Sequence, residues 1–432
     1  MIRPFVDFHI HTTASGGRLS PEEVLQAAYA AGIRVMSITD HDYTMDLTEL
    51  RKTIPDDMTL IQGAEVSALY VDGRGEEHDL HIVALGFDPE NAEMAQLLIP
   101  NAPSRPALEK VIRCIIRSGG TPVLCKLLTD YPDCGNEDID SLVRRFSQLV
   151  EAYGGRGAME VYYTRYSSEE RLYLLRLCMK YGLMISSGSD YHAQEEWETL
   201  EHRISSCACS ELLEHLGIRV NYSVQPGNIL VVSGFSGVGK GTVCKELVKR
   251  TIDEKPVILI RSVTNRAPRS ENENYTFVSR EKFAELAATH QLLEYNDAYS
   301  GNGYGTPVEE VRRALEVGIP LLEIDRVGLC RLLTDGKLDP RRVKSVFVAA
   351  QAHVTAQRLC SRGTETREQI RRRLQQALTE SRYIWLYDAV VINDTVGDAV
   401  RDVIAAFEGN PPDTDFDPAA FHREMQQLLS DF

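Results

Sequence analysis

Residues 228–242 read NILVVSGFSGVGKGT, and this stretch decides the fold of the second half of the chain. Asn228–Ser233 is an apolar run typical of a buried strand, and a helical stretch follows the glycines through Lys249. Between them stands a G-x-x-x-x-G-K pattern. Its glycines let backbone amides face a phosphate, and the helix N-terminus adds its positive end. The pattern predicts a phosphate site made by Gly234, Ser236, Gly237, Val238, Gly239, Lys240, Gly241 and Thr242.

Two polar stretches mark the predicted domain boundaries. They are Asn221–Asn228 (NYSVQPGN) and Gly409–Asp417 (GNPPDTDFD), both rich in turn-forming residues. We therefore expect one domain over residues 1–222, a second over 228–408, and a C-terminal tail over 409–432. The tail ends in Phe421–Phe432, which predicts one short helix.

The composition limits the classes of function. Of the 432 residues, 47 are basic and 63 acidic, so the formal net charge is −16. This charge repels phosphate backbones and disfavours non-specific nucleic-acid binding. We expect no signal peptide, because the N-terminus has no basic region followed by a long apolar stretch. We expect no transmembrane helix, because no apolar run approaches about 18 residues. The nine scattered cysteines, including the C-x-C pair Cys207 and Cys209, favour free thiols in a reducing cytoplasm.

The first segment alternates strands with helices. Ser20 begins a capping box with Pro21 at the first helical position, which predicts a helix to about Ala31 before the strand Ile33–Thr39. This alternation predicts a parallel α/β sheet or barrel. Further strands are expected at Leu60–Ile61, His81–Gly86, Thr121–Cys125, Ala158–Tyr163 and Leu183–Ser187.

Histidines and carboxylates gather in short motifs where these strands end. His9 and His11 form an H-x-H pair, and period-two alternation puts both imidazoles on one face of a strand. Asp40, Glu65 and Asp190 each fall where a predicted strand runs out. Imidazole and carboxylate ligands together suit Zn, Mn or Fe, so these motifs predict a metal centre.

Five motifs in order, DFHIHTTASGG, ITDHD, GAEVS, HIVALGFDP and SSGSDYHA, resemble the PHP family of polymerase and histidinol phosphatase phosphoesterases over about residues 4–195. The resemblance implies a distorted (β/α)₇ barrel with two or three divalent metals. It also implies hydrolysis of a small phosphate ester or nucleotide, in which metals activate water and neutralise developing charge. The implied metal ligands are His9, His11, Asp40, His41, Glu65, His81, Asp190 and His192.

The sequence departs from that family in three places. Lys126 stands where the family usually has a metal-binding histidine, Tyr166 stands where relatives often have a histidine or another polar residue, and the helical insertion around Asn101–Ile116 is short. Two interpretations of Lys126 stay open. The lysine occupies the space of one metal and contacts a substrate phosphate as a point charge, or it marks a site with fewer metals or no activity.

The second segment resembles guanylate kinase over about residues 228–408. The motifs that carry this are GKGT at 239–242, YGT at 304–306, EID at 323–325, RLCSRGTE around Arg358, and the Asn393-Asp394 pair. The resemblance implies a P-loop kinase of three α/β layers with a parallel sheet, which phosphorylates GMP with ATP and Mg²⁺.

The same resemblance implies the site residues. The loop and Arg358 with Asn393 hold ATP, and catalysis depends on Lys240, Arg362, Arg373 and Asp325. Phosphoryl transfer needs positioning and positive charge rather than covalent catalysis, which lysine and arginine supply. The implied GMP site is Ser262, Arg266, Arg269, Tyr275, Glu294, Tyr304, Thr306 and Asp325.

Three hypotheses follow for the whole chain. The leading one is a bifunctional enzyme that combines GMP phosphorylation with metal-dependent ester hydrolysis. The second rests on the short loop Ser270–Asn274, which looks more like ribose 1,5-bisphosphate phosphokinase; the first half would then hydrolyse a phosphoribosyl cyclic phosphate of phosphonate breakdown. The third is a non-catalytic guanylate-kinase-like binding module, a class that lacks a working glycine loop and the arginines of the lid.

Overall fold

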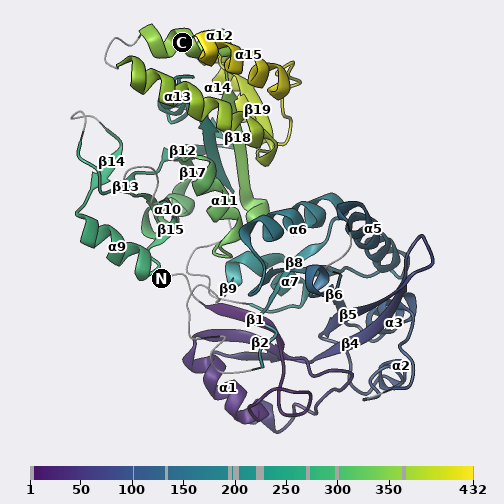
Figure 1. Ribbon diagram of the computed structural model, residues 1–432. Coiled ribbons are helices and arrows are strands. Elements are labelled where there is room, and N and C mark those ends of the chain that lie inside the picture. The colour runs from purple at the N-terminus through teal and green to yellow at the C-terminus, as the bar shows by residue number, and fades with distance from the viewer. Residues whose placement is uncertain are drawn as a thin grey trace. The chain divides into compact units, whose positions relative to one another are not determined.

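The computed structural model describes residues 4–431 except 101, 132–134, 193–196, 198–203, 220–227, 269–272, 297–300 and 362–365 (Figure 1). The chain divides into two compact units, residues 2–223 with 334–340, and residues 224–333 with 341–432. The predicted joint Asn221–Asn228 lies outside the described residues except for Asn228. No helix in the described part of the chain is long and apolar enough to cross a membrane.

The first unit alternates strands and helices along most of its length, coloured purple to teal in Figure 1. Its strands are β1 (Phe5–Ile10), β2 (Ile33–Ile38), β3 (Thr59–Ile61), β4 (Gly63–Val71), β5 (Glu77–Leu85), β6 (Thr121–Leu124), β7 (Ala158–Tyr163), β8 (Met184–Gly188) and β9 (Ile204–Ser205). Its helices are α1 (Pro21–Ala30), α2 (Ala92–Ala95), α3 (Leu108–Arg117), α4 (Leu127–Asp130), α5 (Asn136–Ala152), α6 (Ser168–Tyr181) and α7 (Ser210–His215).

The strands of this unit form two sheets, in the orders β3-β2-β1-β9 and β4-β5-β6-β7-β8. Strands β1, β2 and β3 are parallel, as are β6, β7 and β8. The expectation of a wholly parallel sheet is wrong for β5, which runs antiparallel to both neighbours. The short turn at residues 72–76 joins β4 directly to β5, and a tight turn can join only antiparallel strands. Isolated bridges pair Ile10 with Tyr191 and His41 with Glu65.

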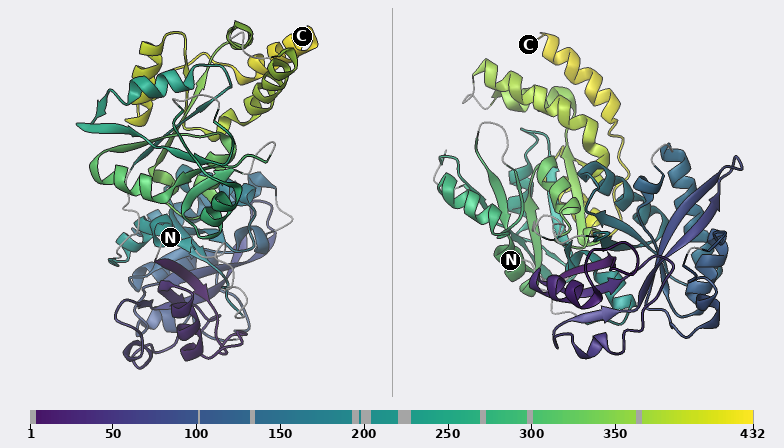
Figure 2. Two further views of the ribbon diagram at one scale, coloured as in Figure 1. Left: turned by 90° about the vertical axis from the view of Figure 1, so that its left-hand side faces the viewer. Right: turned by 60° about the horizontal axis from the view of Figure 1, so that its bottom comes forward.

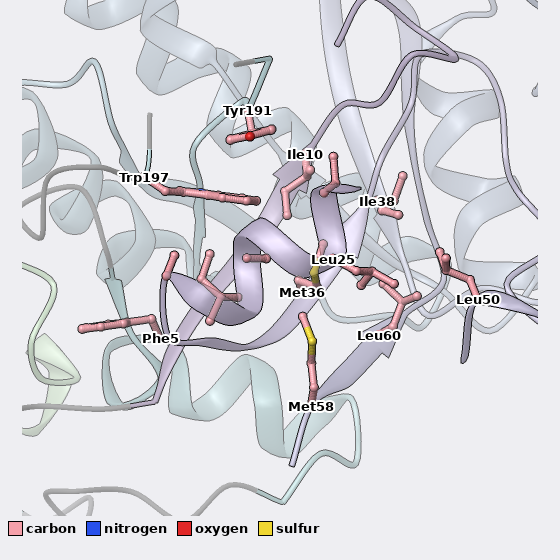
Figure 3. Packing of buried hydrophobic residues seen from close by; sticks show 14 of the residues in the cluster. Phe5, Ile10, Leu25, Met36, Ile38, Leu50, Met58, Leu60, Tyr191 and Trp197 are labelled. Carbon is pink, nitrogen blue, oxygen red and sulfur yellow. The ribbon is translucent and has the colours of Figure 1, made fainter. Parts of the chain in front are cut away.

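A buried apolar cluster fixes the strands that carry the predicted metal ligands. Figure 3 shows side chains of β1, β2 and β3 packed against α1, with Tyr191 and Trp197 on one side. Helix α1 begins with the predicted capping box, in which Ser20 accepts from the Glu23 amide. The Tyr191 and Trp197 rings stack at 3.8 Å, and the Trp197 indole donates to Asp7 at 2.9 Å. This packing holds the C-terminal ends of β1 and β2 in place.

The second unit contains a predominantly parallel sheet with helices around it (Figure 2). Its strands are β10 (Ile229–Gly234), β11 (Thr251–Ile252), β12 (Lys255–Leu259), β13 (Ser262–Thr264), β14 (Tyr275–Phe277), β15 (Leu292–Asn296), β16 (Tyr304–Pro307), β17 (Ile319–Glu323), β18 (Val343–Ala349) and β19 (Ala389–Ile392). Its helices are α8 (Lys240–Leu247), α9 (Arg280–Ala288), α10 (Val308–Val317), α11 (Arg326–Thr334), α12 (Ala352–Ser361), α13 (Arg367–Glu380), α14 (Val396–Phe407) and α15 (Pro418–Asp431).

The main sheet of this unit has the order β11-β12-β17-β10-β18-β19, and a second sheet has the order β14-β13-β16-β15. Strand β10 lies between β17 and β18 and is parallel to both. The loop after β10 therefore opens at the carboxyl edge of the parallel sheet, where ligands of open α/β sheets bind.

The C-terminal segment is an integral part of the second unit. The expected helix at Phe421–Phe432 is found at Pro418–Asp431 as α15, which packs beside α12 and α13 (Figure 2). The Phe421 ring stacks on Phe235 of the glycine loop, with centroids 4.2 Å apart and planes 1° apart. Phe421 and Met425 are buried, so this helix supplies core contacts to the glycine loop.

Candidate functional site

The first candidate site lies at the C-terminal ends of β1 and β8 and near the start of β4, so the prediction that Glu65 follows the end of a strand is wrong. His9 and His11 are fully buried, and their Nε2 atoms lie 3.2 and 3.1 Å from Oε2 of Glu65. The His11 Nε2 atom also lies 3.1 Å from Oδ1 of Asp190. One ligand atom from each of these four residues lies within 4.8 Å of every other. Four side chains of the kinds that bind metal ions are therefore close enough together to share one ion.

A second set of ligand atoms shares Glu65. His41 and His81 join that carboxylate within the same 4.8 Å limit, and the His41 Nδ1 atom lies 3.2 Å from Glu65 Oε2. Both histidines are partly exposed, unlike the first set. Six of the eight predicted ligands are thereby brought together around a single carboxylate.

The other two predicted ligands are placed differently. Asp40 accepts hydrogen bonds from the Thr12 amide and hydroxyl, each at 2.8 Å, and from the Ser15 hydroxyl at 2.6 Å. The His192 ring stacks on His11 at 4.4 Å, and its Nδ1 atom lies 2.6 Å from the Asp190 carbonyl oxygen. Within the described residues neither belongs to the two ligand sets.

The donor set fits a divalent transition metal. His9 Nε2, His11 Nε2, Glu65 Oε2 and Asp190 Oδ1 are all buried. Each imidazole nitrogen lies 3.1 to 3.6 Å from the two carboxylate oxygens, yet none of the four atoms has a hydrogen bond of good geometry within the part of the chain that the structure describes. Leaving buried polar atoms unpaired is costly, and one cation would satisfy all four at once. Two imidazole nitrogens with two carboxylate oxygens suit Zn, Mn or Fe.

Lys126 enters this site from the end of β6. Its ammonium lies 2.8 Å from Oε1 of Glu65, and its side chain is 10% exposed. Burial opposes ionisation of Glu65, but His9, His11 and Lys126 outweigh burial and hold the pKa of that carboxyl well below its usual range. Burial, opposed by Glu65 and reinforced by Lys126 among other cations, lowers the pKa of His41 to about 4. His41 is therefore neutral at pH 7.

Sequence reasoning missed three supporting residues. Glu160 lies 2.9 Å from His9 Nδ1, Asp130 lies 2.7 Å from His81 Nδ1, and the Tyr163 hydroxyl donates to Asp190 at 3.0 Å. Such partners orient ligating side chains and fix the histidine tautomer. The available signal was the single carboxylate of Glu160 inside the otherwise uncharged strand AMEVYY.

The second candidate site is built on the glycine loop. Gly234 and Gly239 have φ of 146° and 93°, in the region that favours glycine. A Cβ on Gly239 would lie 2.8 Å from the Asn393 amide nitrogen, so a side chain has no room there. Helix α8 begins at Lys240, whose ammonium donates to the Gly234 carbonyl at 2.6 Å and the Phe235 carbonyl at 3.2 Å.

A cavity of about 290 Å³ adjoins this loop. It is lined by the loop lysine and by polar residues of the second sheet and the end of β17, so residues predicted to bind ATP and residues predicted to bind GMP face one space. Its lining residues are Gly234, Ser236, Lys240, Ser262, Tyr275, Glu294, Asn296, Tyr304, Gly305, Glu323, Ile324, Asp325, Gln376 and Glu380.

Two carboxylates in this cavity are held in fixed orientations. The buried Glu294 accepts from the Thr306 hydroxyl at 2.5 Å. Asp325 accepts from the Asn296 amide at 2.9 Å and from the Gly328 backbone at 2.9 Å. Asn296 was not predicted, and neither was Glu323, although Glu323 ends the strand next to β10. An acid at that strand end was visible in the quoted EID motif.

The predicted cations are placed around the loop. Arg373 donates to the Ser236 hydroxyl at 3.1 Å, and Arg358 donates to the Val238 carbonyl at 3.2 Å. The Asn393 amide donates to the same carbonyl at 2.6 Å, so it supports the loop. Arg269 and Arg362 lie outside the described residues.

The remaining predicted cation, Arg266, lies beside aromatic rings. The Arg266 guanidinium forms an ion pair with Glu273, and it lies 5.0 Å from the Tyr275 ring centroid and 5.9 Å from that of Tyr304. These contacts hold Arg266 beside two residues that line the cavity.

Comparisons with known proteins match each half separately. A family model described as guanylate kinase matches residues 226–410. The guanylate kinase of Lactobacillus delbrueckii subsp. bulgaricus is 42% identical over 210 residues, which cover 48% of this chain and 95% of that protein.

Solved structures give two further similarities. A protein described as a metal-dependent phosphoesterase, from Bifidobacterium adolescentis, aligns with a TM-score of 0.38 and 17% identity, covering 50% of this chain and 97% of that one. A guanylate kinase from Anaplasma phagocytophilum aligns with a TM-score of 0.31 and 25% identity, covering 44% of this chain and 89% of that one.

Proposed function

The chain belongs, through residues 226–410, to the guanylate kinase family, and we propose that this part transfers the terminal phosphoryl group of ATP to GMP. One observation carries the choice of acceptor: Glu294 and Asp325 face the same cavity as Lys240. Guanine presents a ring N–H and an amino group along one edge, and carboxylates accept from both. Adenine has a ring acceptor at the corresponding nitrogen, which a carboxylate repels.

The proposal gives each group a part. Lys240, at the start of α8, reaches the outer phosphates of ATP, and the backbone amides of the loop face the others. Mg²⁺ bound to ATP neutralises phosphate charge. Arg373 and Arg358 contact the loop, which supports a role for their guanidinium groups in stabilising the charge that develops during transfer. Ser262 and Tyr275 line the cavity and Arg266 lies beside Tyr275, which supports a role for the three in binding the GMP phosphate.

The test is ADP release by the full chain with Mg·ATP and GMP, dGMP, AMP or ribose 1,5-bisphosphate as acceptor. We expect turnover with GMP and dGMP, little with AMP, and none with the ribose bisphosphate. Turnover with the ribose bisphosphate alone would overturn the proposal and favour the phosphonate-breakdown hypothesis. ATP binding without turnover on any acceptor would favour a binding module.

For residues 1–222 we propose divalent-metal-dependent hydrolysis of a small phosphate ester. The four unpaired ligand atoms of His9, His11, Glu65 and Asp190 support this, together with the ordered PHP motifs. A bound metal supplies Lewis acidity and activates water. The bridges at Ile10 and His41 support a distorted barrel in which β1, β2 and β4 to β8 surround this centre.

A cavity of about 390 Å³ beside His41 suits a small ester. Arg105 lines it, so a cation for phosphate oxygens lies near the metal ligand His41. The test is hydrolysis of a panel of phosphate monoesters and nucleotides by the chain loaded with Mn²⁺, with Asp190→Asn as the control. No metal-dependent hydrolysis across the panel would count against the proposal.

A further inference from the structure

Lys126 occupies an unusual position in the metal centre. It follows β6 with φ of 47° and ψ of 23°, a left-handed conformation that few non-glycine residues adopt. Its backbone amide donates to Glu160 Oε2 at 3.1 Å, and its ammonium lies 2.8 Å from Glu65 Oε1. The residue is buried. These contacts fix the ammonium inside the centre.

Glu65 is the only carboxylate shared by the two ligand sets within the described residues. Its Oε2 atom faces His9, His11 and His41 at 3.1 to 3.2 Å. Its Oε1 atom faces Lys126. A carboxylate that bridges two metal ions offers one oxygen to each, and here the ammonium occupies the second oxygen.

The charges of the buried side chains also favour a single metal ion. Three buried carboxylates, Glu65, Asp190 and Glu160, contact His9 or His11, and Lys126 contributes one positive charge. Among these groups two negative charges remain, which one divalent ion neutralises. A second divalent ion would have to lie beside the fixed ammonium, and like charges repel strongly where water is excluded. The other two nearby carboxylates already have partners: Asp40 accepts from Thr12 and Ser15, and Asp130 lies 2.7 Å from His81 Nδ1.

We propose that this centre binds a single divalent ion, held by His9, His11, Glu65 and Asp190, and that the Lys126 ammonium takes the place of a second ion. The inference rests on the proposed metal-dependent activity and deepens it. The fixed ammonium supplies a point charge beside the ion, and His41 and His81 stay free of a second ion.

The test counts and characterises bound Mn²⁺ in the nucleotide-free full chain. Equilibrium dialysis followed by elemental analysis gives the number of ions, and electron paramagnetic resonance distinguishes an isolated Mn²⁺ from an exchange-coupled pair. We expect one ion per chain with the six-line signal of an isolated Mn²⁺. Lys126→His removes the ammonium and adds a ligand, so we expect two ions and a coupled signal.

The outcomes separate the two proposals. Two coupled ions in the unaltered chain would overturn the single-ion inference and leave the metal-dependent activity standing. Less than half an equivalent of Mn²⁺ would overturn both. Asp190→Asn should lose the ion; its retention would place the ion elsewhere and overturn the inference. The unaltered chain decides the count even where Lys126→His fails to fold, which its melting temperature reports.

Discussion

Replacing Phe421 by alanine should destabilise the second unit strongly, although Phe421 lies beyond the matched family region. Its side chain is 3% exposed and stacks on Phe235 of the glycine loop. Removing a buried phenylalanine costs about 3–5 kcal/mol, because the lost transfer free energy adds to that of the cavity left behind. With a urea m-value of about 2 kcal/mol/M, the midpoint should fall by about 1.5–2.5 M.

The assay is urea unfolding followed by the fluorescence of Trp385, which lies in the second unit. Trp197→Phe in both reference and variant removes the signal of the first unit. Arg423→Ala is the matched control on the same helix, since Arg423 is exposed and its ion pair with Asp417 is long at 3.9 Å. We expect that control to shift the midpoint little. A loss below about 1 kcal/mol for Phe421→Ala would refute the idea that α15 belongs to the core.

The other predictions concern the two sites. Lys240→Ala should lower kcat for ADP release at least about 100-fold, because a positive charge on the phosphates is lost. Glu294→Gln should raise KM for GMP about 10-fold or more while KM for ATP stays near its starting value, since a charge-assisted hydrogen bond contributes about 1.5–3 kcal/mol. Saturating Mn²⁺, at about 100 times its Kd, should stabilise the first unit by about 2.7 kcal/mol, and EDTA should reverse the rise in melting temperature.

For each of these predictions, a specific outcome would contradict it. An unchanged rate for Lys240→Ala would remove the loop from catalysis, and an equal rise in both KM values for Glu294→Gln would indicate a general disturbance of the cavity. Asp190→Asn should show no melting shift with Mn²⁺; a shift as large as that of the unaltered chain would place the metal outside the predicted ligands.

Local sequence could predict those parts of the fold that depend on neighbours along the chain. The capping box at Ser20, the strand at Ala158–Tyr163 and the helix after the glycine loop need only periodicity and turn chemistry. The antiparallel direction of β5 was missed because pairing direction depends on the connection between strands. The turn at residues 72–76 between β4 and β5 is that connection, and apolar periodicity does not report it.

In the sites too, contacts between residues close in sequence could be predicted, and contacts between residues far apart in sequence could not. Period two alone puts His9 and His11 on one face, so their pairing could be predicted. The contact of Lys126 with Glu65 joins residues 61 positions apart in sequence and requires β4, β5 and β6 to be adjacent. Sequence showed that a lysine replaces a ligand, but only the structure shows which oxygen it contacts. That contact supports the interpretation in which Lys126 takes the place of one ion, because an ammonium on the shared carboxylate competes directly with a second ion.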